Sequence, residues 1–182
     1  MKKRRMILTA LMCSVGIMCG SLGVKADAVR VVTLGADLTD QQKQMMLNYF
    51  NTNDQQSQIM TVTNADEKAR LSKYVPAEQI GSRTVSCAYV LPTTQGGIQV
   101  KTANLNYVTP NMIASSLSTS GVTNCQVIAA CPFEVSGTGA LTGVLMAYEQ
   151  ASGETLDETK KDIATEEMVT TGNLAQSVGQ DQ

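Results

Sequence analysis

The residues of this sequence that come closest to a chemical motif lie at 133–143, FEVSGTGALTG. Three glycines and three hydroxyl side chains stand there in front of an apolar helical pattern, as in a phosphate-binding turn. A Walker loop requires a lysine after its second glycine, and no such lysine follows here. A dinucleotide fingerprint requires Gly-x-Gly-x-x-Gly, whereas the spacing of Gly137, Gly139 and Gly143 is one residue too long. The stretch therefore does not predict a nucleotide site.

The backbone at a helix start offers a different kind of site. Free N–H groups in the first turn of a helix can hold an anion or a carboxylate. Glycines there also permit a tight turn and let the helix lie close on a sheet, and we favour this structural interpretation. Ligand binding is the alternative, and its candidate residues come from two predicted strand-to-helix turns: Thr33, Gly35, Asp37, Ser136, Gly137, Thr138 and Gly139.

The residue types available limit the catalytic chemistry. The chain has no histidine, which excludes the common zinc sites, the Ser-His-Asp triad and the Cys-His dyad as usually built. Serine nucleophile motifs with a glycine elbow or a lysine partner are also absent. We therefore predict no catalytic residue, no metal site and no cofactor, and favour a non-enzymatic protein. Carboxylates that could still support glycoside cleavage are Asp37, Asp40, Asp54, Glu78 and Glu134.

The N-terminal residues indicate export. Four basic residues at 2–5 precede a mostly apolar run at 6–24, and small residues follow at Ala26 and Ala28. This is the layout of a signal peptide over residues 1–26, with cleavage after Ala26 or Ala28. An uncleaved anchor is the alternative, since the run is just long enough to span a bilayer. We expect an extracellular or cell-envelope location, and no stable transmembrane span if the leader is cleaved.

Composition narrows the set of partners. The leader holds five of the 14 basic residues and none of the 16 acidic ones, so the chain beyond it carries a formal charge of −7. A domain this acidic is a poor candidate for nucleic acid binding through charge. Tryptophan is absent and aromatic residues make up 4%, so stacking platforms for sugars or bases are scarce. We expect an unidentified cell-envelope or extracellular partner and no nucleic acid.

Three cysteines lie beyond the leader: Cys87, Cys125 and Cys131. They allow one internal disulfide at most, leaving one thiol over. Cys125 and Cys131 are separated by about 20 Å in an unbroken strand and cannot pair there. A bond from Cys87 to either remains open, although small buried thiols are the favoured interpretation.

The elements that must position these residues alternate along the chain. Apolar patterns and turn residues predict strands at residues 29–34, 57–63, 82–91, 98–107 and 125–131. Helices are predicted after cap or turn residues at Thr39, Asn64, Thr109, Gly139 and Thr155. Three of these caps have the spacing of a capping box, with the partners Gln42, Glu67 and Glu158. The order β-α-β-α-β-β-α-β-α-α predicts an α/β fold with a mixed β-sheet of about five strands flanked by helices. It forms a single globular domain over residues 27–153, followed at 154–182 by a C-terminal helix and a flexible tail from about Thr170.

Three expectations are more local. The short link between the strands at 82–91 and 98–107 predicts an antiparallel hairpin. The strand at 125–131 is apolar on both faces, which is typical of a covered sheet. In the helix after Gly139, one stripe of side chains has core spacing: Leu141, Val144, Leu145 and Tyr148.

Four segments in matching order resemble the YpuA-like family, a domain of unknown function found in secreted or envelope-associated proteins of Gram-positive bacteria. They are VTLGADLT at 32–39, IGSRTVSCA at 80–88, NLNYVTPNM at 104–112 and PFEVSGTGALTG at 132–143. The resemblance covers the chain up to about Gly153. It implies location and kinship, and it supplies no catalytic residue.

Three functional hypotheses follow. The favoured one is a secreted or cell-envelope-associated binding or interaction module without enzyme activity. A carboxylate-dependent extracellular hydrolase is the alternative, with its site near the strand ends where open α/β sheets place ligands. An assembly component with a flat protein-binding surface is the third.

Overall fold

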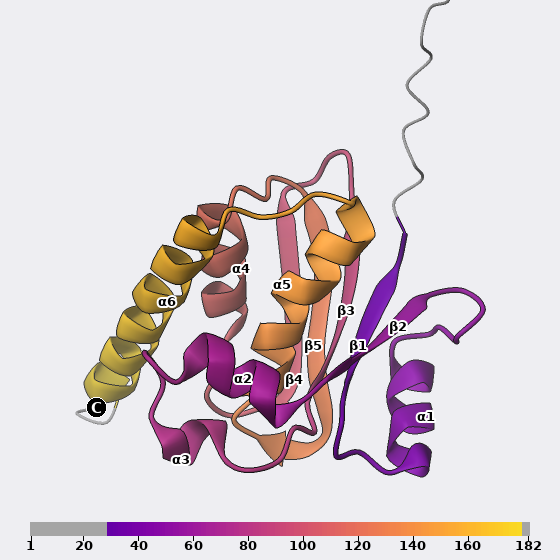
Figure 1. Ribbon diagram of the computed structural model, residues 1–182, viewed down its shortest axis with the longest axis horizontal. Coiled ribbons are helices and arrows are strands. Elements are labelled where there is room, and N and C mark those ends of the chain that lie inside the picture. Colours follow the sequence, from indigo (N-terminus) through magenta and orange to yellow (C-terminus); the bar gives the residue numbers. More distant parts are fainter. Residues whose placement is uncertain (1–28, 180–182) are drawn as a thin grey trace, which may run out of the picture.

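Residues 29–179 are described by a computed structural model, in which helices flank a mixed five-stranded sheet (Figure 1). The strands are β1 (Val31–Gly35), β2 (Gln58–Val62), β3 (Cys87–Pro92), β4 (Ile98–Leu105) and β5 (Cys125–Val135). The helices are α1 (Asp40–Tyr49), α2 (Asn64–Leu71), α3 (Ala77–Ile80), α4 (Pro110–Thr119), α5 (Thr138–Ser152) and α6 (Glu158–Gly179). The predicted fold class is confirmed, with the short helix α3 as an addition. The expected leader at 1–26 lies outside the described residues.

The strands are ordered β2-β1-β3-β5-β4 across the sheet. β1 pairs in parallel with β2, β5 pairs in parallel with β4, and β3 is antiparallel to both β1 and β5. The predicted hairpin between β3 and β4 is therefore wrong, because β5 lies between these strands. Parallel neighbours need a crossover connection, and α4 provides it between β4 and β5. An interior position suits β5, whose residues are apolar on both faces.

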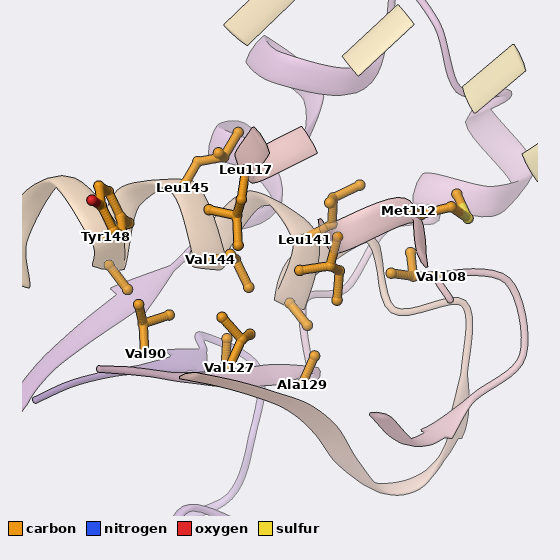
Figure 2. Packing of buried hydrophobic residues seen from close by; sticks show 14 of the residues in the cluster. Val90, Val108, Met112, Leu117, Val127, Ala129, Leu141, Val144, Leu145 and Tyr148 are labelled. Carbon is orange, nitrogen blue, oxygen red and sulfur yellow. The ribbon is translucent and has the colours of Figure 1, made fainter. Parts of the chain in front are cut away.

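Helix α5 lies across one face of the sheet and forms the larger core (Figure 1). Its predicted stripe is confirmed, since Leu141, Val144, Leu145 and Tyr148 are all buried. Figure 2 shows these side chains against Val90, Val127 and Ala129 of the sheet and Leu117 of α4. Burying one large apolar side chain contributes about 1.5–3 kcal/mol. This stripe therefore fixes α5, and with it the turn that precedes the helix.

The opposite face of the sheet is covered by α1. Met46 of this helix and Phe50, its C-cap residue, pack with Val32 and Leu34 of β1 in a second, smaller core. The ring of Phe50 lies 6.2 Å from that of Tyr89 on β3. Alternate residues of β1 therefore supply the two cores, as the two-residue period of a strand requires.

The caps of two helices agree with prediction and two differ. Thr39 and Gln42 form the expected capping box of α1, and Thr109 accepts a hydrogen bond from the Met112 N–H at the start of α4. The capping box of α2 consists of Thr63 and Asp66, one residue earlier than the predicted pair Asn64 and Glu67. Helix α6 begins at Glu158, and the side chain of Asp157 just before it accepts a hydrogen bond from the Lys160 N–H. The cap of this helix is therefore two residues later than the predicted cap Thr155.

Helix α6 packs along α4 at the edge of the molecule (Figure 1). It continues to Gly179, past the point near Thr170 where a tail was expected to begin. No helix within residues 29–179 is both long and apolar enough to cross a membrane.

The three cysteines of the described chain are buried and free. The thiol groups of Cys87 and Cys131 both donate to the Val85 carbonyl oxygen, at 3.8 and 3.4 Å. Burial raises the pKa of Cys87 to about 12. This agrees with the favoured interpretation of small buried thiols, because a thiol with so high a pKa is a poor nucleophile.

Candidate functional site

Glycines bring α5 and the segment before β3 unusually close to β1. A Cβ atom on Gly143 would stand 2.3 Å from the Thr33 hydroxyl oxygen, and one on Gly35 would stand 2.4 Å from the Thr84 carbonyl oxygen. Real Cβ atoms do not approach other atoms this closely, so both positions require glycine. Two of the predicted ligand residues, Thr33 and Gly35, are therefore buried in packing contacts.

The first turn of α5 has an unusual cap. Gly137 occupies the N-cap position in the left-handed region, with φ 94° and ψ 8°, and has no side chain to cap the helix. The Ala140 N–H instead donates to the hydroxyl of Ser86, at 2.8 Å, from a segment 54 residues earlier in the chain. The Leu141 N–H donates to the Gly137 carbonyl oxygen at 3.1 Å. The N–H groups of Thr138 and Gly139 precede the intrahelical ladder, as the first donors of a helix do.

A buried glutamate from α2 lies beside this helix start. Glu67 is 1% exposed, and its Oε1 would be only 3.1 Å from a Cβ on Gly139. The hydroxyl of Thr84 donates a hydrogen bond to the same oxygen. The other carboxyl oxygen, Oε2, is buried and has no hydrogen-bond partner among the described residues. Orphaned polar atoms of this kind are rare in folded proteins and call for an explanation.

The surroundings of Glu67 perturb its titration. Burial raises the pKa of this carboxyl group, because the charged form loses hydration. Hydrogen bonds from the Thr138 and Thr84 hydroxyls act in the opposite direction, and the nearby charges of Asp37 and Asp66 raise the pKa further. Perturbed carboxyl groups beside a cleft are candidates for functional sites.

The segment at 84–86 joins the two turns that were predicted to bind a ligand. The Thr84 N–H donates to Oδ2 of Asp37 at 2.7 Å, and the Asp37 N–H donates to the Thr84 carbonyl oxygen at 2.9 Å. The side chains of Thr84 and Ser86 contact Gly139 and Ala140 on the other side. The turn after β1 and the turn before α5 are thus bridged by residues that the sequence did not single out.

A cleft of about 490 Å³ opens at the start of α5. It takes in all four predicted residues of the second turn, while Thr33, Gly35 and Asp37 are not among the described residues that line it. Binding by either set of residues stays a prediction. The lining consists of Glu67, Glu78, Gln79, Ile80, Gly81, Ser82, Arg83, Val85, Ser86, Asn106, Phe133, Val135, Ser136, Gly137, Thr138 and Gly139.

A second hollow of about 510 Å³ lies near the C-terminal end of α5, and its lining includes Met60, Met146 and Gly153. Two of the three glutamates that line it are paired, since the ammonium group of Lys161 lies 2.8 Å from Glu149 and 2.6 Å from Glu158. The cleft at the start of α5 is the better candidate, because the first turn of this helix and the buried Glu67 both border it.

The carboxylates proposed for catalysis are spread over several places. Glu78 lines the cleft, Glu134 accepts a hydrogen bond from Asn106 at 3.1 Å, and Asp40 and Asp54 are exposed outside the lining. No group of three metal-ligating side chains capable of holding an ion occurs in the described part of the chain.

These features define an α/β protein with a polar cleft where a helix start meets a buried glutamate. The chain belongs to the family described as "Protein of unknown function (DUF1002)", which matches residues 34–182. Over 150 residues the chain is 42% identical to the "Uncharacterized protein YpuA" of Bacillus subtilis (strain 168), covering 82% of this chain and 51% of that protein. The chain thus spans about half the length of this curated relative. The resemblance to the YpuA-like family is confirmed. No solved structure shows a significant match.

Proposed function

We propose that this protein is an exported, non-enzymatic binding module of the cell envelope, and that its ligand occupies the cleft at the start of α5. One observation carries the proposal: the first turn of α5, at 137–139, and the buried carboxyl group of Glu67 border the same cleft. The leader-like N-terminus supports an envelope location.

The composition of the cleft suits a ligand with both polar and apolar parts. Its lining includes hydroxyl and amide side chains, and Phe133, which is 42% exposed, adds an apolar surface. Small-molecule sites combine such apolar surface with a few polar groups that fix orientation. An exposed aromatic ring beside hydrogen-bonding groups therefore favours specific binding over a purely structural hollow.

Binding to isolated cell walls tests this proposal. Purified full-length protein is incubated with cell walls of Bacillus subtilis, and the bound fraction is measured against protein concentration. We expect saturable binding that weakens in a Phe133→Ala variant but not in an Ile163→Ala variant, which alters an exposed apolar side chain on α6. Absence of saturable binding, or equal binding by both variants, would contradict the proposal.

One observation favours the hydrolase as a second candidate. Glu67 and Glu78 both line the cleft, and the raised pKa of Glu67 is a property of general acids in glycoside cleavage. In this scheme Glu67 would protonate the leaving oxygen while Glu78 assists a water molecule. Release of reducing sugar from cell-wall glycans by the wild-type protein, abolished in both Glu67→Gln and Glu78→Gln, would establish the hydrolase in place of the binding module.

A further inference from the structure

The sheet ends on one side in a strand with a free edge. β2 pairs with β1 and is the outermost strand of the order β2-β1-β3-β5-β4 (Figure 1). The Gln58 N–H and the Val62 carbonyl oxygen form hydrogen bonds with residues that flank β1, at 2.9 Å each. Because the backbone groups of successive strand residues point to opposite edges, the N–H and C=O groups of Ile59 and Thr61 face away from β1.

Neighbouring hydrogen bonds set the limits of this edge. The Ser57 N–H donates to the Asn53 carbonyl oxygen at 3.0 Å, and the Thr63 N–H donates to Oδ2 of Asp66 at 2.8 Å. Between these two positions, the outward N–H and C=O groups have no hydrogen-bond partner within residues 29–179. Two residues of β2 therefore offer two donors and two acceptors to another strand.

The two edges of the sheet are protected differently. Exposed edge strands usually carry a lysine, a proline or a bulge that prevents pairing with another chain. The opposite edge strand, β4, has the exposed Lys101 and a register shift between Ala103 and Leu105. β2 lacks these devices, because residues 55–65 include no charged residue and no proline, and because its register with β1 is regular.

Apolar side chains accompany the free edge on both faces of the sheet. Ile59 pairs with Val32, which lies in the core under α1, so Ile59 is on the α1 side, where it is 37% exposed. Met45 and Tyr49 of α1 are exposed on the same side of the sheet. On the other side, Met60 lines the hollow near the C-terminal end of α5. A strand that pairs with β2 covers Ile59 and Met60 as well as the backbone groups.

We propose that this strand is β2 of a second copy of the chain, paired antiparallel about a twofold axis at Met60. In this register Ile59 lies opposite Thr61 of the second copy and exchanges two hydrogen bonds with it, and the twofold axis repeats the pair. All the free backbone groups of both edges are then paired. Met60 lies opposite the same residue of the second copy, with a Cα separation of about 4.5 Å, as in a pair without hydrogen bonds.

The charge of the chain favours this place for the contact between copies. Beyond the expected leader the chain carries a formal charge of −7, so two copies repel each other where charged surfaces meet. The uncharged residues 55–65 let two acidic copies approach closely. The dimer carries two copies of the cleft at the start of α5 and can contact a polymer at two places, although the pairing itself does not depend on any ligand.

Sedimentation velocity of the full-length protein over a range of concentrations tests the dimer. We expect a reversible monomer–dimer equilibrium at fixed ionic strength. Ile59→Lys places a charge on each side of the axis, and Thr61→Pro removes an outward N–H but none of the hydrogen bonds to β1. Each variant should raise the dissociation constant about tenfold or more. Gln99→Lys introduces the same charge at an exposed position of β4 and should leave the equilibrium unchanged.

Cross-linking tests the register without relying on those variants. Met60→Cys places two thiol groups opposite each other at the axis, within reach of a disulfide bond. After treatment with oxidised glutathione, mass spectrometry of peptides should identify a link between position 60 of one copy and position 60 of the other. Gln99→Cys, treated in the same way, should give no link between the two copies of position 99.

Two results would overturn the proposal. One is association of the Ile59→Lys and Thr61→Pro variants as strong as that of the wild-type protein, or a link at position 99 as abundant as the link at position 60. The other is a wild-type protein that stays monomeric at every concentration and gives no link at position 60, which would favour an extended segment of a different protein as the occupant of the edge.

Discussion

The hydroxyl group of Thr84 donates a hydrogen bond to Oε1 of Glu67, and both side chains are buried. Thr84→Val preserves the shape of the side chain but removes the donor. We expect the free energy of unfolding to fall by about 1–3 kcal/mol, because a buried acceptor loses its partner. Urea denaturation provides the measurement, with Thr61→Val on the exposed side of β2 as the matched control. Equal losses in both variants would contradict a specific role for this hydrogen bond.

The close approach of Gly143 to Thr33 gives a second prediction. Gly143→Ala should lower the free energy of unfolding by roughly 1–3 kcal/mol, because the added methyl group overlaps the Thr33 side chain. Thr33→Ala in the same chain removes the hydroxyl group and should restore part of the loss. The four proteins form a double-mutant cycle, and the absence of coupling between the two positions would show that α5 does not rest on β1 in this way.

The pKa of Glu67 predicts how stability depends on pH. A carboxyl group whose pKa is raised by folding binds more protons in the folded than in the unfolded state between the two pKa values. Its contribution to stability is therefore full below the ordinary value of 4.5 and declines as pH rises through the folded value. Compared with Glu67→Gln, the wild-type protein should lose stability as pH rises above 4.5 in a series of urea titrations. A constant difference between the two proteins across this range would refute the prediction.

Lys161 gives a prediction of the same sign in a higher pH range. Its side chain is 2% exposed. Burial alone would lower the pKa of Lys161, but the hydrogen bonds to Glu149 and Glu158 and the negative charges of these two groups together raise it. The stabilisation should be complete below the ordinary value of 10.5 and be lost as pH rises through the folded value. Lys161→Met should cost about 1.5–3 kcal/mol at neutral pH, as expected for charged hydrogen bonds.

The neighbouring residue supplies the control for Lys161. Lys160 is exposed on the same helix, and Lys160→Met should change the free energy of unfolding by less than about 0.5 kcal/mol. If both variants unfold at the same denaturant concentration, the ion pairs of Lys161 do not stabilise the attachment of α6.

Periodicity was enough to predict most elements of the fold but not their neighbours in the sheet. The stripe from Leu141 to Tyr148 identified α5 because its spacing reports burial on one face of a helix. Nothing local to β3 or β4 indicates that β5 separates them. The position of β5 between them depends on the crossover connection through α4 and on strand pairing between segments far apart in the chain.

Glu67, the buried glutamate beside the cleft, was predicted to be a helix-capping residue because of its local spacing. Asn64 and Glu67 have the spacing of a capping box, yet Thr63 and Asp66 form the actual one. The shift of one residue turns Glu67 to the buried face of α2, four positions before the buried Leu71. The (i, i+4) spacing of these two residues was the available signal. The cleft walls from α3 and residues 81–86 depend on tertiary packing and had no such signal.

Hydrogen–deuterium exchange with and without solubilised cell-wall fragments tests whether a ligand binds in the cleft at the start of α5, because it locates a bound ligand on the full-length protein. Slower exchange is expected at residues 78–86 and 133–141, which surround the cleft, and unchanged exchange in α1. Slower exchange confined to α1 or α6, with residues 133–141 unaffected by fragments that bind, would contradict the assignment of the cleft as the binding site.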